Sequence, residues 1–142
     1  MEGKIVRRLC IDYRKVNNVI QGDGFPMQSV DNMLRLLPYK KYYSKLDLKS
    51  GYWQFLLGPI AQELSTFITP FGQYRWKRMP FGFKTAPACF QRVMNFVLKD
   101  QIYISALVYL DDVICWGDSL EEMEGIITLI VDSLNAAGLK LN

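Results

Sequence analysis

Histidine is absent from the 142 residues, and cysteine occurs only three times. The lack of histidine excludes every catalytic triad, zinc site and general base that depends on an imidazole ring. Cys10, Cys89 and Cys115 are odd in number and lack Cys-x-x-Cys spacing, which argues against a disulfide framework or a zinc site. We therefore expect reduced cysteines that are buried as small apolar residues, and catalysis that rests on carboxylates, lysines or tyrosines.

Long apolar runs are absent as well. No segment approaches the roughly 20 apolar residues that a helix needs to span a bilayer. Glu2, Lys4, Arg7 and Arg8 interrupt the N-terminal stretch where a signal peptide would carry its apolar core. We therefore expect an intracellular protein with no membrane partner.

The residues that are present predict one folded domain or part of one. Half of the chain is apolar, and 8 Tyr, 8 Phe and 3 Trp supply large side chains for a core. The charge is uneven, because residues 1–92 hold 15 Lys and Arg against 6 Asp and Glu, whereas residues 93–142 hold 2 against 8. This split suits a protein that holds a phosphate backbone in one place and cations in another. An unevenly charged solvated surface is the more common explanation of such a split.

Hydrophobic periodicity predicts alternating helices and strands, with helices packed on one antiparallel sheet in an α+β arrangement. Two long helices are expected, one after Thr85 with Pro87 near its start, and one opened by a capping box of Ser119 and Glu122 and closed near Gly138. Their apolar faces are expected to include Phe90, Val93, Met94, Val97 and Leu98 on the first helix and Leu120, Met123, Ile127, Ile130 and Leu134 on the second. The other expected elements are strands over residues 6–13, 42–48, 103–110 and 113–116, a short helix over residues 30–37 and a hairpin over residues 66–79.

Three aspartates stand at the ends of apolar strands. Asp111 and Asp112 separate two buried strands, and Asp47 lies near the end of another. Crowded carboxylates repel each other unless cations compensate, so a turn that presents them to Mg²⁺ is one solution, and an Asp-rich turn in water is the bland alternative. If the strand of Asp47 lies beside the hairpin, the three carboxylates converge and suffice for two cations about 3.5–4 Å apart, the arrangement used in phosphoryl displacement.

Four segments carry a resemblance to a known family. They are residues 109–112 (Tyr-Leu-Asp-Asp), 44–52, 79–83 and 86–92. In their order and spacing they resemble the reverse transcriptases of gypsy-type long-terminal-repeat retrotransposons, and the resemblance runs from about residue 8 to residue 142. It implies a partial polymerase right hand, with a ferredoxin-like palm whose antiparallel sheet packs on helices and part of the fingers. It also implies that residues 1–142 form a partial reverse transcriptase domain, without thumb, connection or ribonuclease H.

The resemblance also implies site residues and cofactors. Asp47, Asp111 and Asp112 take the positions of the catalytic, metal-holding aspartates, with two Mg²⁺ ions expected and Mn²⁺ as the alternative ion. Tyr52 takes the position of the aromatic residue that excludes a 2′-hydroxyl, and Arg8 that of a triphosphate-binding arginine, for which a guanidinium is suited. The nucleotide-pocket segment contains Phe81 and Gly82. Ordinary packing or a surface position is the alternative for each nucleotide-binding residue.

The implied activity is RNA-directed DNA polymerisation, in which deoxynucleotides are transferred to a primer 3′-hydroxyl. The implied partners are an RNA or DNA template with its primer, deoxynucleoside triphosphates and the rest of a Gag-Pol-type polyprotein. The implied location is the cytoplasm or a virus-like particle, with the nucleus as an alternative. Two other hypotheses stay open, namely an inactive relic that at most binds nucleic acid, and another palm polymerase such as a viral RNA polymerase.

Overall fold

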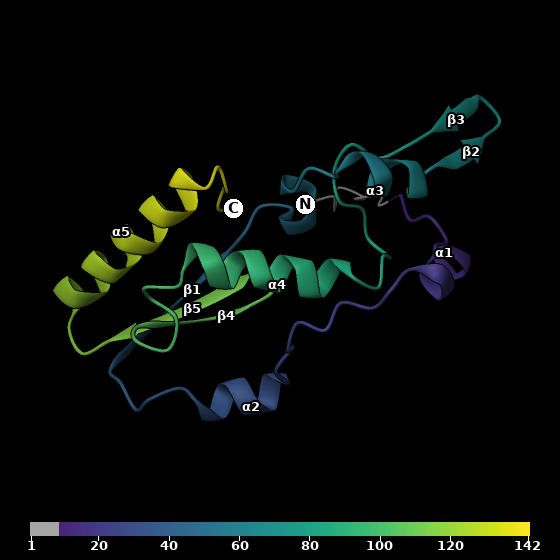
Figure 1. Cartoon of the computed structure of the whole chain (residues 1–142). Coiled ribbons are helices and arrows are strands. Elements are labelled where there is room, and N and C mark those ends of the chain that lie inside the picture. Colours follow the sequence, from purple (N-terminus) through teal and green to yellow (C-terminus); the bar gives the residue numbers. More distant parts are fainter. Residues whose placement is uncertain (1–8) are drawn as a thin grey trace, which may run out of the picture.

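A three-stranded antiparallel sheet lies at the centre of the computed structural model, which describes residues 9–142 (Figure 1). Its strands follow the order β1-β5-β4, so β1, from the first third of the chain, pairs with β5 near the end of the chain. The strands are β1 (Tyr42–Asp47), β4 (Ala106–Tyr109) and β5 (Asp112–Gly117). The expected α+β class is confirmed.

The register of the sheet places the aspartates. Asp47, the last residue of β1, is the partner of Asp112, the first residue of β5. Asp112 is also the partner of Tyr109 across the β4–β5 hairpin, so only Leu110 and Asp111 form the turn. The expected neighbourhood of β1 and the hairpin is therefore confirmed, whereas Asp112 belongs to the strand and not to the turn.

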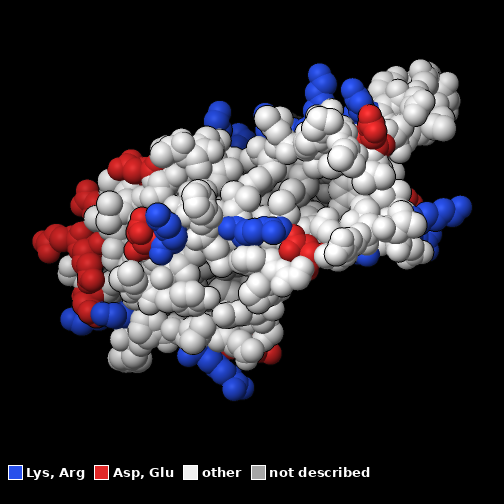
Figure 2. All heavy atoms as spheres, viewed as in Figure 1, with Lys and Arg blue, Asp and Glu red and all other residues white. Residues whose placement is uncertain are grey.

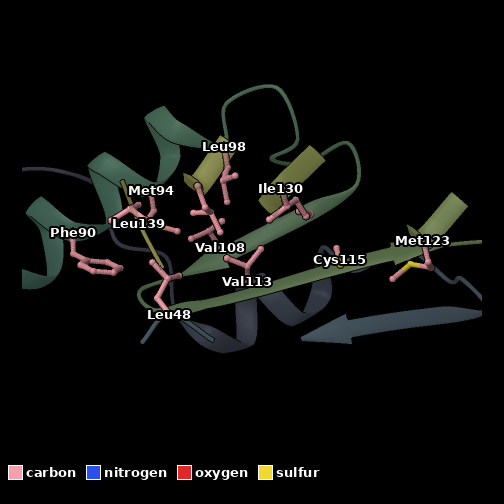
Figure 3. Packing of buried hydrophobic residues seen from close by; sticks show 12 residues of the cluster. Leu48, Phe90, Met94, Leu98, Val108, Val113, Cys115, Met123, Ile130 and Leu139 are labelled. Atoms are coloured by element: carbon pink, nitrogen blue, oxygen red, sulfur yellow. The ribbon is translucent and has the colours of Figure 1, made fainter. Parts of the chain in front are cut away.

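Two long helices cover one face of the sheet, as Figure 1 shows. They are α4 (Ala86–Val97) and α5 (Leu120–Ala136). Val113 and Cys115 of β5 point toward them, because alternate residues of a strand share a face. Figure 3 shows these side chains packed among residues of both helices. The core cluster consists of Leu48, Phe90, Met94, Leu98, Ala106, Val108, Val113, Cys115, Met123, Ile130, Leu134 and Leu139.

The remaining elements extend the molecule beyond the sheet. The helix α2 (Val30–Arg35) lies on the other side of the sheet from α4 in Figure 1. A second, smaller core centres on Tyr13, Met79, Phe83 and Ala86. The elements of that end are α1 (Arg14–Val19), the 3₁₀ helix η1 (Gly51–Gln54), α3 (Pro59–Leu64), and the hairpin strands β2 (Phe67–Thr69) and β3 (Gly72–Tyr74).

The prediction of an N-terminal strand over residues 6–13 is wrong for residues 9–13, the part that the structure describes. Residues 9–13 form no strand, and α1 begins at Arg14. Tyr13 instead packs in the second core, where its hydroxyl donates to the carbonyl oxygen of Ser65 at 2.9 Å. The ladder of a strand needs a partner, and none lies beside residues 9–13 in the described chain. Residues 6–8 lie outside the described residues.

The predictions for the helix ends and for single buried residues are confirmed in some cases and wrong in others. Ser119 accepts a hydrogen bond from the backbone N–H of Glu122, and Gly138 follows α5 with a φ of 73°. Thr85 precedes α4 but its side chain makes no capping hydrogen bond, because its backbone is already helical. Leu120, which was expected on the apolar face of α5, is 68% exposed, so no other segment covers it. Cys115 is buried as expected, whereas Cys10 is exposed.

Candidate active site

An open hollow of about 540 Å³ lies where β1 ends and the β4–β5 hairpin turns. Asp47 and Asp111 both line it, although 64 positions separate them in the chain. Its lining residues are Asp47, Leu48, Lys49, Ser50, Gly51, Tyr52, Phe81, Asp111 and Asn142. The fold therefore brings two of the three expected carboxylates to one solvent-open hollow.

The turn that carries Asp111 has an unusual backbone. Leu110 has a φ of 53°, a conformation that a residue with a side chain adopts at a cost of about 1 kcal/mol or more. Gln91 of α4, which is buried, holds this turn with both ends of its amide. Its Nε2 donates to the carbonyl oxygen of Val108 at 2.8 Å, and its Oε1 accepts from the N–H of Leu110 at 2.8 Å. The strained turn is thus fixed by a side chain from the helix beneath it.

The backbone on the other side of the hollow lies close to Asp111. The N–H of Leu48 donates to the carbonyl oxygen of Asp111 at 3.0 Å. A Cβ placed on Gly51 would lie 3.0 Å from the Cβ of Asp111 and 3.3 Å from the ring of Phe90. Only a residue without a side chain fits there unless its neighbours shift. Gly51 thereby allows the chain that follows β1 to lie against the turn.

Asp112 has different surroundings from the other two aspartates. Its carboxylate accepts from the ammonium of Lys45 at 3.0 Å, and it lines a separate hollow between the sheet and α2. The hydrogen bond to Asp112 raises the pKa of Lys45, and the charges of Asp47 and Asp111 raise it further. Within residues 9–142 no group of three or more Asp, Glu, His or Cys side chains is close enough together to hold a metal ion. The three expected carboxylates therefore lie near one another without forming one metal-sized cluster.

Tyr52 and Phe81 form the apolar part of the hollow. Their ring centroids lie 5.3 Å apart in an edge-to-face arrangement, and Tyr52 also contacts Phe90 at 5.3 Å. Burial raises the pKa of the Tyr52 hydroxyl, and the negative charge of Asp111 raises it further. Tyr52 is therefore a neutral, partly buried phenol beside Asp111.

Two other predicted nucleotide-binding residues are placed differently. Gly82 does not line the hollow. Its φ is 102°, its carbonyl oxygen accepts from the side chain of Asn17 at 2.7 Å, and an added Cβ would lie 3.3 Å from the ring of Tyr13. This environment gives Gly82 a structural role, and its nucleotide-binding role stays a prediction. Arg8 lies outside the described residues.

Most acidic residues of the second half of the chain lie away from the hollow, and only Asp111 among them lines it. Figure 2 shows acidic side chains gathered at the end of the molecule where α5 begins. The first acidic residues that follow β5 are Asp118, Glu121, Glu122 and Glu124. They come after Gly117 at the C-terminal end of β5, whereas Asp112 is at its N-terminal end. The uneven charge of the sequence therefore reflects mainly a solvated surface, and the hollow draws on Asp47 and Asp111 alone.

Residues 4–142 match the family model described as reverse transcriptase (RNA-dependent DNA polymerase). The chain belongs to the reverse transcriptase family. The resemblance drawn from its four motifs is confirmed, because the matched residues include nearly the whole chain and every motif. The hollow lies between the motifs at residues 44–52 and 109–112, and we therefore take it as the candidate active site of this reverse transcriptase domain.

Curated relatives of this reverse transcriptase domain are polyproteins of mobile elements and viruses. The retrovirus-related Pol polyprotein from transposon 297 of Drosophila melanogaster is 39% identical over 94% of this chain and 13% of the relative. The genome polyprotein of Petunia vein clearing virus is 35% identical over the whole chain and 6% of the relative. The chain thus spans only a small part of the length of the relatives that it matches.

Solved structures support the same assignment. A foamy viral protease-reverse transcriptase in complex with double-stranded DNA has a TM-score of 0.88 and 29% identity, over 95% of this chain and 24% of that one. A foamy viral protease-reverse transcriptase in complex with an RNA/DNA hybrid also gives a TM-score of 0.88, at 29% identity over 95% of this chain and 18% of that one. The expected fold class is confirmed as a partial reverse transcriptase fold of helices and antiparallel sheet. No helix in the described part of the chain has the length and apolar character required to cross a membrane.

Three residues around the hollow had no role in the sequence-based prediction. They are Lys45, which pairs with Asp112, Gly51, which lies against Asp111, and Gln91, which holds the turn. All three lie within the motifs at residues 44–52 and 86–92. A polar residue such as Gln91 between apolar helix positions was a signal, because a buried amide needs hydrogen-bond partners.

Proposed function

We propose that this domain carries the nucleotidyl-transfer site of an RNA-directed DNA polymerase of a retroelement polyprotein. The observation that carries the proposal is the hollow shared by Asp47, Asp111, Tyr52 and Phe81, which combines oxygen ligands with an aromatic wall. The reaction joins the primer 3′-oxygen to the α-phosphorus of a deoxynucleoside triphosphate. The bond to the β-phosphate breaks, pyrophosphate leaves with that electron pair, and the hydroxyl proton passes to water.

The donor set fits hard divalent cations. Asp47, Asp111 and Asp112 supply carboxylate oxygens only, which suits Mg²⁺, with Mn²⁺ as the alternative. Two such ions would stabilise the attacking and departing oxygens of the displacement. Asp47 and Asp111 already share the hollow, and Asp112 lies opposite Asp47 in the sheet register. Asp112 would exchange its contact with Lys45 for a place in this site.

The nucleotide-binding roles extend the proposal to the aromatic wall. Tyr52 would lie beneath the incoming sugar and exclude a 2′-hydroxyl, and Phe81 would pack beside it, as their contact in the hollow supports. Gly82 would shape the same segment, and Arg8 would bind the triphosphate. The substrates are an RNA or DNA template with its primer and deoxynucleoside triphosphates. We place the domain inside the cell as part of a Gag-Pol-type polyprotein, in the cytoplasm or a virus-like particle, with the nucleus as the alternative.

Primer extension on an RNA template with Mg²⁺ tests the proposal. In a polypeptide that contains this domain, we expect extension to be lost in Asp111→Asn and retained in Asp132→Asn, which removes the same charge from an exposed position of α5. Extension that survives Asp111→Asn would overturn the assignment. If template-primer binding occurs without any extension, the chain is the catalytically inactive binding module that forms the second candidate function.

Tyr52→Ala separates this proposal from the hypothesis of an RNA polymerase. A small side chain removes the barrier to the 2′-hydroxyl, so ribonucleotide incorporation should rise relative to deoxynucleotide incorporation. Trp116→Phe, a conservative change in a buried residue of β5 outside the hollow, is the control. An unchanged ratio in Tyr52→Ala would remove Tyr52 from its proposed role.

A further inference from the structure

A second hollow, of about 210 Å³, adjoins the candidate active site. Lys49 lines both hollows. The lining residues of the second hollow are Lys49, Trp53, Gln54, Arg78, Gly138 and Lys140. Three of the six are cations, and none carries a carboxylate. Its volume lies below the roughly 300 Å³ at which pockets for drug-sized ligands begin, which suits a small anionic group.

The wall of this hollow is held together by one hydrogen-bond network of Gln54 and Arg78. The Nε2 of Gln54 donates to the carbonyl oxygens of Lys49 at 2.7 Å and Lys140 at 2.9 Å, and its Oε1 accepts from the N–H of Lys140 at 2.7 Å. The Nη1 of Arg78 donates to the carbonyl oxygens of Trp53 at 3.1 Å and Gln54 at 3.0 Å. Segments that are far apart in the chain are thereby joined, so the backbones that bear the cations are preorganised.

The cations of this hollow lie together with no carboxylate beside them. Arg14, Lys40, Lys45 and Arg92 each pair with an aspartate. Lys49, Arg78 and Lys140 are in no ion pair anywhere in residues 9–142, although they line the same small space. Like charges gathered without a counter-ion repel each other, and a bound anion removes that repulsion.

Trp53 is the aromatic residue that lines the same hollow. Its Nε1 is buried and has no hydrogen-bond partner among the described residues. Buried polar atoms are nearly always hydrogen-bonded, and the Nε1 of Trp76, whose ring stacks on that of Trp53, is also unpaired in the described chain. The indole is held in place by Trp76 and Phe81, with ring centroids 6.4 Å and 5.8 Å away.

We propose that this hollow is a phosphate-binding subsite beside the catalytic hollow. Lys49 and Lys140 would provide point charges, and the Nε and Nη2 groups of Arg78, which are not used by the backbone carbonyls, would donate to phosphate oxygens. The phosphate belongs either to a free polyphosphate or to the backbone of a bound nucleic-acid strand. Both sources present the same tetrahedral oxyanion.

Binding in a buffer without divalent cations tests the proposal separately from catalysis. Pyrophosphate and a single-stranded oligothymidylate are titrated in turn, with tryptophan fluorescence and calorimetry as the measurements. The test variant is Lys49→Gln with Lys140→Gln. Its control is Lys84→Gln with Lys99→Gln, which removes the same net charge from exposed positions elsewhere. Arg78 is left unchanged because it supports the backbone.

We expect the test variant to weaken the binding of at least one probe by tenfold or more, and the control to change it less than threefold. A selective loss for pyrophosphate identifies a free polyphosphate as the source, and a loss confined to the oligonucleotide identifies the strand backbone. Equal weakening in both variants would mean general electrostatic attraction and would overturn the proposal. The proposal would also be overturned if neither probe bound to the unchanged chain. The catalytic site is tested separately by primer extension, so this result would leave the proposed function untouched.

Discussion

Gly51 and Asp111 lie in direct contact across the candidate active site. A Cβ on Gly51 would come within 3.0 Å of the Cβ of Asp111, although the two residues belong to different segments of the chain. The strand end that carries Asp47 and the turn that carries Asp111 can therefore approach closely. This contact sets how near the two carboxylates of the hollow lie to each other.

Gly51→Ala should displace the turn of Asp111. Because the added methyl group meets both Asp111 and the ring of Phe90, we expect destabilisation of about 1–3 kcal/mol and loss of any polymerase activity. Gly125→Ala is the matched control, since an added Cβ there meets nothing within 4 Å and the helix should gain up to about 1 kcal/mol. Urea unfolding measures both. Equal stability in the two variants would show that the contact with Asp111 imposes no constraint.

Gln91→Leu should release the hairpin turn. The change keeps a similar side-chain volume but leaves the carbonyl oxygen of Val108 and the N–H of Leu110 without their partner. We expect a loss of about 1–3 kcal/mol in urea unfolding, because unsatisfied buried groups retain their desolvation penalty. Faster amide hydrogen exchange at Leu110 should accompany it. Gln73→Leu on the exposed strand β3 is the control, and protection of Leu110 equal to that of the control would contradict the prediction.

The pair of Lys45 and Asp112 should give a stability contribution that disappears in alkali. The folded state raises the pKa of Lys45, chiefly through its hydrogen bond to Asp112. The contribution is therefore fully present below the ordinary lysine pKa of about 10.4 and is lost as pH rises through the raised value. Urea unfolding at pH 8 and pH 11 should show a larger loss for the unchanged chain than for Lys45→Gln. If the unchanged chain and Lys45→Gln lost the same free energy of unfolding between pH 8 and pH 11, the pair would be excluded as a source of stability.

The three cysteines should differ in reactivity toward a disulfide reagent. Cys10 is exposed, whereas Cys115 is buried and its burial raises the pKa of its thiol, so less of the reactive thiolate is available. In the native chain we expect a fast phase that Cys10→Ser removes and Cys115→Ser leaves intact. In urea all thiols should react at similar rates. A fast phase that survives Cys10→Ser would contradict the exposure of Cys10.

Much of the fold was predictable from local patterns. The positions of α4 and α5, the hairpin β4–β5 and the cap at Ser119 follow from apolar periodicity and from residues that act within a few positions of each other. The expected strand over residues 9–13 failed because a strand requires a partner, and the partner is a property of the whole fold. Cys10 and Leu120 were placed wrongly for a similar reason, since the apolar character of a residue does not determine whether another segment covers it.

The sequence by itself determined the family and named Asp47, Asp111 and Asp112, because motifs in a set order are a property of the chain alone. Only the tertiary structure decided that Asp47 and Asp111 share a hollow while Asp112 pairs with Lys45. It also decided that Gly51 and Gln91 hold the turn, and that Lys49, Arg78 and Lys140 meet beside it. These relationships join residues that are distant in the chain, and the register of the sheet and the packing of its helices set their distances.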